Sequence, residues 1–286
     1  MEKILIPTDF SKCADAALDF VVQTAKISHV EIVAIHVSEF YPILYGDPVG
    51  MSAVYPLAYK ENAEKELLTI KNRLMTDLKL TVTTKVYDAP VLDAILKAAK
   101  DFHANLVVMG THGGSGIGEK LFGSQSASMI ARGGLPVLLI PCKYKWKAPK
   151  KIVLATNGFE KESSVLEFLL DFVEKYHADL HIVVFTNDNK DKAATLVEHE
   201  YHLKNYTEMI ERRYGISTVS RHIYGDDLEE ALETYIKENS IDILAMVTHK
   251  RTMLGRLFNP SKTKRISGHH LKVPLLALPS KAKPSE

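Results

Sequence analysis

Residues 3–10 read KILIPTDF, and residues 151–159 repeat this pattern as KIVLATNGF. Three more stretches return in the same order: YDAPVLDA (87–94) as YGDDLEEA (224–231), MGTH (109–112) as MVTH (246–249), and LPVLLIP (135–141) as KVPLLALP (272–279). Matches spread over both halves indicate an internal duplication. We therefore expect two domains, residues 1–143 and 150–280, joined by the short basic linker KYKWKAP (143–149).

Each repeat alternates short apolar runs with segments of helical periodicity. In the first repeat the apolar runs predict strands over residues 4–6, 31–37, 81–87, 106–109 and 137–140. Helical spacing predicts helices over residues 15–27, 60–80 and 91–102. This alternation is typical of a parallel sheet covered by helices on both faces. The fold class is thus α/β, with two tandem doubly wound, five-stranded, Rossmann-like domains of flavodoxin-like strand order.

Ligands of doubly wound sheets bind beyond the carboxyl ends of the strands, where the strand order reverses. The places to search are therefore the residues that follow Ile6, Val37 and Met109.

Composition narrows the class of protein. The 286 residues are 46% hydrophobic and 25% charged, which excludes a mainly disordered chain. With 36 Lys and Arg against 35 Asp and Glu, the near-zero net charge argues against a nucleic-acid binder. No apolar stretch reaches membrane-spanning length, so we expect a soluble, cytoplasmic protein without membrane contact. Cys13 and Cys142 are too few for a disulfide framework, and we expect Cys13 to be a packed thiol.

A glycine-rich stretch follows the fourth predicted strand. Residues 110–124 read GTHGGSGIGEKLFGS, with five glycines between positions 110 and 118. Glycine lets backbone amides approach an anion closely, and Ser124 is predicted to be the N-cap of the next helix. A helix N-terminus behind such a loop is suited to bind phosphate. The stretch is not a P-loop, because Glu119 interrupts the pattern and Leu121 stands where Ser or Thr would hold magnesium.

These motifs together resemble the universal stress protein family. The spacing of Gly110, Gly113 and the Gly123-Ser124 pair is similar to that of the ATP-binding subgroup of the family. Residues 6–11, IPTDFS, resemble the first strand and turn of the family, and LPVLLIP (135–141) resembles its last strand. The resemblance covers the chain twice, so the chain is identified as a tandem member.

The resemblance implies specific roles around an adenine nucleotide. Asp9 and the backbone of Val37 would contact adenine, with Pro7 and Gly110 near the ribose. The phosphates would be bound by Gly113, Gly123, Ser124 and the amides of Gln125 and Ser126. The full set of candidate binding residues is Pro7, Thr8, Asp9, Val37, Met109, Gly110, His112, Gly113, Gly123, Ser124, Gln125 and Ser126.

For several of these residues, an interpretation without ligand binding stays open. Asp9 is also placed to cap the helix that starts near residue 11. His112 either touches phosphate or lies in solvent, and the glycines alone would suit a plain connector. On the long helix of the second repeat, His199 and His202 have the spacing for a surface metal site, although a solvated helix face is the favoured interpretation.

The second repeat departs from the motif. Its loop, residues 247–261, reads VTHKRTMLGRLFNPS, so a valine, a lysine and a proline replace Gly110, Gly113 and Gly123. Asn157 replaces Asp9. Added side chains fill the space for phosphates, and proline has no amide to donate. We expect no ATP binding there, and the basic run over residues 250–265 is either a solvated face or an anion or partner site.

The resulting function is a nucleotide-dependent regulator of a stress response that binds ATP. ADP and AMP are alternative ligands, and Mg²⁺ is a candidate companion ion. A slow ATPase or phosphoryl-transfer enzyme, and a scaffold that binds no nucleotide, are the alternatives, and no catalytic residue is assigned. Expected partners are the second domain in an internal pseudo-dimer through the last strands, a second copy of the chain in a homodimer, and an unidentified protein.

Overall fold

The protein is described here by a computed structural model that covers residues 2–38, 54–111, 123–156, 163–187, 193–248 and 272–279. The chain forms two compact units, the first ending at Lys143 and the second beginning at Tyr144. Within the described ranges, no helix combines the length and the apolar character needed to cross a membrane.

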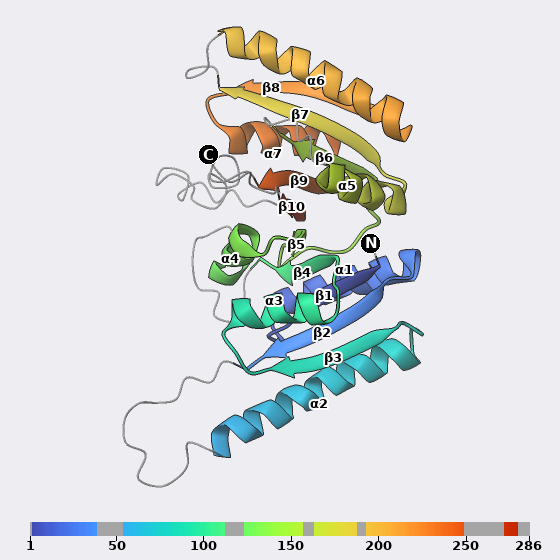
Figure 1. Ribbon diagram of the computed structural model, residues 1–286, viewed down its shortest axis with the longest axis vertical. Coiled ribbons are helices and arrows are strands. Elements are labelled where there is room, and N and C mark those ends of the chain that lie inside the picture. Colours follow the sequence, from blue (N-terminus) through green and yellow to red (C-terminus); the bar gives the residue numbers. More distant parts are fainter. Residues whose placement is uncertain are drawn as a thin grey trace, which may run out of the picture. The chain divides into compact units, whose positions relative to one another are not determined.

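The first unit contains a five-stranded parallel sheet (Figure 1). Its strands are β1 (Lys3–Pro7), β2 (Glu31–Val37), β3 (Val82–Tyr87), β4 (Leu106–Gly110) and β5 (Val137–Ile140). Their order is β3-β2-β1-β4-β5. The α/β doubly wound class is confirmed. The strand order equals the first five positions of the Rossmann order 3-2-1-4-5-6, whereas the flavodoxin-like order that we expected, 2-1-3-4-5, begins with the second strand.

Central strands are buried because helices cover both faces of the sheet. Leu5 lies beside Val33 of β2 on one side and beside Val107 of β4 on the other, and all three are essentially inaccessible to water. Continuous apolar runs, rather than alternating ones, are what such a doubly covered sheet requires. The direction of strand addition reverses between β1 and β4, so the crevice of the fold lies at their carboxyl ends.

In the described residues of the first unit, four helices connect the strands. They are α1 (Lys12–Ser28), α2 (Val54–Thr76), α3 (Val91–Asp101) and α4 (Ser124–Arg132). α1 and α2 line a common groove. α3 packs against α4 (Figure 1). α2 begins and ends earlier than the predicted range 60–80, and its buried face includes Leu67 and Leu74.

The second unit repeats the architecture. Its elements in chain order are β6 (Lys151–Ala155), α5 (Ser163–Tyr176), β7 (Asp179–Asn187), α6 (Ala193–Tyr214), β8 (Thr218–Gly225), α7 (Leu228–Asn239), β9 (Ile243–Thr248) and β10 (Leu275–Pro279). The strands are parallel and ordered β8-β7-β6-β9-β10, the same arrangement as in the first unit. The internal duplication in the sequence is therefore a duplication of the fold.

The basic linker packs onto the second unit rather than hanging free. Lys147 forms an ion pair with Asp242, a carboxylate that is only 4% exposed. The other oxygen of Asp242 accepts hydrogen bonds from the amides of Lys150 and Lys151, at 2.7 and 3.0 Å. Burial, together with the charge of Asp242, raises the pKa of Tyr144 to about 12. The residues just before β6 thus belong to the second unit structurally.

Candidate functional site

Three strand ends of the first unit meet at one edge of the sheet. β1 lies between β2 and β4, so Pro7, Val37 and Gly110 end neighbouring strands. These are the places that the sequence selected. Met109 is buried in the core, with 7% of its surface exposed, so only its backbone is available at this edge.

The turn after β1 is held by its own side chains. The Thr8 amide donates to the carbonyl of Ile35 at 2.8 Å, and the amide of Phe10 donates to Thr8 Oγ1 at 3.0 Å. Phe10 takes a left-handed conformation with φ of 58°. A residue with a Cβ adopts this conformation only rarely. The turn therefore presents Asp9 in a fixed place at the crevice.

Asp9 is not the N-cap of α1. The cap is Ser11, whose hydroxyl accepts from the Ala14 amide at 3.3 Å. Asp9 lies two residues earlier and is exposed, with Oδ1 accepting from the Ser11 amide at 3.1 Å. The capping interpretation of Asp9 is thus wrong by two positions, because a serine hydroxyl fills the capping place.

Gly110 has no room for a side chain. A Cβ built on it would lie 2.8 Å from the backbone carbon and oxygen of Cys13, closer than real Cβ atoms come. The start of α1 therefore packs directly on the end of β4. Glycine is required here by the fold itself, independently of any ligand.

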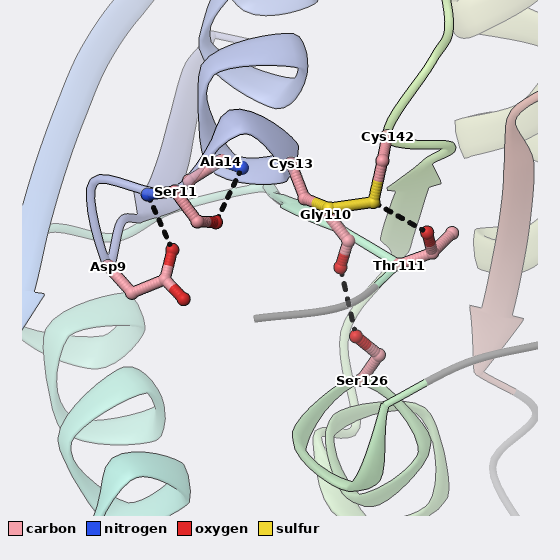
Figure 2. Close-up of a disulfide and its surroundings, with 8 residues drawn as sticks. All are labelled: Asp9, Ser11, Cys13, Ala14, Gly110, Thr111, Ser126 and Cys142. Carbon is pink, nitrogen blue, oxygen red and sulfur yellow. Dashed lines mark hydrogen bonds between the residues drawn. A yellow bond between two sulfur atoms is a disulfide. The ribbon is translucent and has the colours of Figure 1, made fainter. Parts of the chain in front are cut away.

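The chain returns to this edge at the start of α4. The Gly123 amide donates to the carbonyl of Thr111 at 2.6 Å. The hydroxyl of Ser126 donates to the carbonyl of Gly110 at 3.0 Å (Figure 2). Both ends of the glycine-rich stretch are thereby attached to the end of β4. Residues 112–122, including His112 and Gly113, lie outside the described residues.

Our assignment of Ser124 as N-cap is wrong. The cap is Gly123, in an extended conformation, and Ser124 is the first helical residue. The reason is the bond of Ser126 to Gly110, which sets where the helix begins. The first hydrogen bond of the helix runs from Ala127 to Gly123, so the amides of Ser124, Gln125 and Ser126 have no partner carbonyl within α4. Ser124 and Gln125 are exposed.

Two features of this edge escaped the sequence analysis. His36, near the end of β2, has its Nδ1 2.8 Å from the carbonyl of Thr8 and stacks on Phe10 with ring centroids 4.7 Å apart. The position of His36 next to Val37, where β2 ends, was the feature of the sequence that could have indicated it. Cys13 and Cys142 form a disulfide, which corrects the expectation of a packed thiol. They lie 129 residues apart, and only the fold brings them together.

The corresponding edge of the second unit is described only in part. Thr156 donates its amide to Val183 at 3.0 Å, as Thr8 does to Ile35 in the first unit. Val247, which replaces Gly110, is buried. Asn157 and the basic run over residues 250–265 lie outside the described residues.

The histidines of α6 and β8 contact their own neighbours. His199 Nδ1 and His222 Nε2 lie 2.9 and 2.7 Å from Oγ1 of Thr186, and His202 faces Glu198 at 3.7 Å. Burial, followed by the nearby His199, lowers the pKa of His222. In the described parts of the chain, no three His, Cys, Asp or Glu side chains gather as a metal site would need.

Comparison with known proteins gives the same family for both halves. The model of the universal stress protein family matches residues 1–141 and again residues 149–279. A universal stress protein of Methanocaldococcus jannaschii is 30% identical over 155 residues, which are 50% of this chain and 96% of that protein. Another from the same organism is 28% identical over 150 residues, 52% of this chain and 84% of that protein.

Solved structures show the same fold over nearly the whole chain. A universal stress protein from Archaeoglobus fulgidus is similar with a TM-score of 0.68 and 18% identity, over 97% of this chain and 98% of that one. One from Pseudomonas aeruginosa has a TM-score of 0.60 and 12% identity, over 98% and 93%. With the family model matched in both repeats and the fold shared along the chain, this protein belongs to the universal stress protein family, as a tandem two-domain member.

Proposed function

We propose that the first unit binds ATP at the carboxyl ends of β1, β2 and β4, and that the protein acts as a nucleotide-dependent regulator. The observation that carries the proposal is the attachment of the α4 N-terminus to the end of β4, through Gly123 to Thr111 and Ser126 to Gly110. It brings first-turn amides without helical partners to the crevice of a doubly wound sheet. Such amides, with the helix dipole behind them, favour phosphate.

The remaining roles follow the family resemblance. Asp9 and the Val37 backbone contact adenine, and Pro7 and Gly110 lie near the ribose. The β1 turn supports this role of Asp9, because the bonds of Thr8 and Ser11 fix the turn and leave the carboxylate exposed. Gly113, Gly123 and Ser124, with the amides of Gln125 and Ser126, hold the phosphates. The second unit, with Val247 in place of Gly110, binds no ATP in this manner.

Calorimetry on nucleotide-stripped protein tests the proposal. ATP, ADP and AMP are titrated separately, each with and without Mg²⁺. We expect one adenine-nucleotide site per chain. No heat with any of the three would refute nucleotide binding, and two equivalent sites would refute the assignment of the second unit. Mass spectrometry of a small molecule that co-purifies with the chain identifies the natural ligand independently.

A regulator and an enzyme differ in turnover. Phosphoryl transfer needs a seat for a metal and a positioned nucleophile or base. Of the acidic side chains, only Asp9 is placed at the crevice by the motif, and its proposed role is adenine contact. We therefore expect single-turnover hydrolysis slower than about 1 s⁻¹, the low end of ordinary enzymes. A faster rate would identify the first unit as an ATPase.

A further inference from the structure

The disulfide lies beside the proposed nucleotide site. Cys13 is the second residue of α1, and Cys142 follows the end of β5 by two residues. Figure 2 shows the two sulfur atoms next to Gly110 and Thr111, where the glycine-rich stretch begins. Both cysteines are half-buried rather than sealed in the core. They are the only cysteines of the chain, so the second repeat, which lacks the glycine motif, has no such bond.

Contacts connect the disulfide to both sides of the site. On one side, Cys13 is followed within α1 by Ala14, whose amide is bound by the capping Ser11. On the other side, the backbone of Cys13 packs on Gly110, and Cys142 Sγ lies 3.7 Å from Thr111 Oγ1. The bond thus ties the turn that presents Asp9 to the strand end that anchors the glycine-rich stretch.

The fold holds the two cysteines together without needing the bond. β4 and β5 pair directly, with Gly110 beside Ile140, and α1 packs across both strands. These contacts do not depend on the sulfurs. After reduction the two thiols therefore stay close, and the bond can form again in the folded protein.

We propose that Cys13 and Cys142 form a reversible redox switch that controls nucleotide binding in the first unit. The oxidised pair fixes the crevice in its binding geometry, and reduction loosens it. This inference rests on the proposed function. The co-reactant is a dithiol, either a small molecule or a protein.

Reduction of the disulfide is a thiol–disulfide exchange in two steps. A thiolate of the dithiol attacks Cys142 Sγ, forms a mixed disulfide and releases Cys13 as a thiolate. The second thiol of the reductant then displaces Cys142, so the protein gains two electrons and two protons and the reductant leaves as its disulfide. Release of Cys13 is favoured because the first turn of a helix stabilises a thiolate.

Reduction changes the geometry next to Gly110. Bonded sulfurs lie about 2 Å apart, whereas non-bonded atoms of this size stay roughly 3.5 Å apart. Without the bond, the sulfur atoms move apart by about 1.5 Å, and the first turn of α1 and the segment after β5 are free to shift with them. Because Cys13 packs on Gly110 without a gap, this movement reaches the ends of β1 and β4. Coupling between two sites is commonly 5- to 150-fold, and we expect about tenfold weaker ATP binding after reduction.

The test measures ATP affinity of the full chain in both redox states. Nucleotide-stripped protein is oxidised with glutathione disulfide or reduced with dithiothreitol, and alkylation with intact mass counts the thiols. We expect about tenfold weaker binding after reduction and recovery after reoxidation. By linkage, ATP should protect the disulfide from reduction by the same factor. The double variant Cys13→Ser/Cys142→Ser should bind like the reduced protein, and dithiothreitol should leave its affinity unchanged.

Other outcomes overturn the switch. Equal affinity in the two states, or a bond that the dithiol reduces only when the protein unfolds, would show a purely structural disulfide. If the oxidised protein binds no nucleotide, the proposed function fails separately. Amide hydrogen exchange then decides the switch, because the bonds of Thr111 to Ile140 and of Gly123 to Thr111 should open more often after reduction. Unchanged exchange at both amides would refute it.

Discussion

Asn105 and Asp242 accept equivalent pairs of hydrogen bonds in the two units. Each directly precedes the fourth strand of its unit and accepts two backbone amides from the start of the first strand. Asn105 binds the amides of Glu2 and Lys3, both at 3.0 Å, and is exposed. Asp242 is buried and also pairs with Lys147. The two repeats therefore share this pair of hydrogen bonds, but the acceptor is neutral and exposed in the first unit and charged and buried in the second.

Replacing Asn105 or Asp242 by alanine should lower the free energy of unfolding by unequal amounts. Asp242→Ala removes the acceptor of two amides and the partner of Lys147 from a buried place, and should lower the free energy of unfolding by about 3 kcal/mol. Asn105→Ala should cost only about 1 kcal/mol, because water replaces its oxygen. Trp146 is the single tryptophan and lies in the second unit, so its fluorescence follows the Asp242 variant, and circular dichroism follows both. Equal costs would contradict the role of burial.

Filling Gly110 should destabilise the first unit. Gly110→Ala puts a Cβ against the backbone of Cys13, which has no flexible end to move, and should cost about 1 to 3 kcal/mol. Gly134→Asn is the control, since its φ of 63° suits asparagine and no atom lies within 4 Å of an added Cβ. Chemical denaturation measures both. A Gly110→Ala variant as stable as the control would show that the start of α1 moves freely.

Transplanting the second loop into the first should abolish ATP binding. Gly113→Lys adds a side chain where the phosphates are proposed to lie, and Gly123→Pro removes the amide whose bond to Thr111 attaches the start of α4 to the end of β4. The fold should survive Gly123→Pro, because the φ of −66° already suits proline and only the bond to Thr111 is lost, at about 1 kcal/mol. Calorimetry should show at least a hundredfold loss, roughly 3 kcal/mol of binding free energy.

The control for this loss is again Gly134→Asn, which changes a glycine at the opposite edge of the sheet, between α4 and β5. Its ATP affinity should equal that of the unchanged chain. If the folded double variant binds ATP normally, the phosphate site lies elsewhere.

The second unit should lose stability in acid. Burial lowers the pKa of both His181 and His222 in the folded protein. In the unfolded chain both histidines have the ordinary pKa of 6.5, so the unfolded chain binds protons at a higher pH than the folded protein does. The stabilisation is complete above pH 6.5 and is lost as the pH falls through that value towards the lower folded pKa. Trp146 fluorescence should show a lower melting midpoint at pH 5.5 than at pH 7.5.

A double variant isolates these histidines. His181→Asn keeps a polar atom where Nδ1 meets Tyr235, and His222→Gln keeps one where Nε2 meets Thr186. The groups around His222 are His199 and Glu200 from α6 and Tyr224 from β8. The variant should have a flatter dependence on pH over this range. An unchanged dependence would assign the acid sensitivity to other groups.

The sequence predicted what depends on local pattern. Apolar runs such as residues 106–109 and 137–140 gave the strands, because a doubly covered sheet leaves no alternation to misinterpret. The repeat gave the duplication, and the strand-end rule selected Pro7, Val37 and Gly110. These inferences need only periodicity and topology.

Contacts between distant residues were not predictable in the same way. Nothing near Cys13 in the sequence points to Cys142, and the partner of Gly110 is a backbone rather than a side chain. The cap of α4 was misplaced by one residue because the hydroxyl of Ser126 reaches back to the end of β4. The flavodoxin-like order failed because strand order depends on the direction of each crossover, and hydrophobic periodicity does not encode that direction.

The ion pair between Lys147 and Asp242 decides where the two halves can be cut apart for separate expression. A gene fragment that starts at residue 150 would lack the pair, the indole of Trp146 and the buried ring of Pro149. A fragment that starts at Tyr144 would keep all three. A recombinant carboxy-terminal half should therefore include residues 144–149, although their composition is that of a linker.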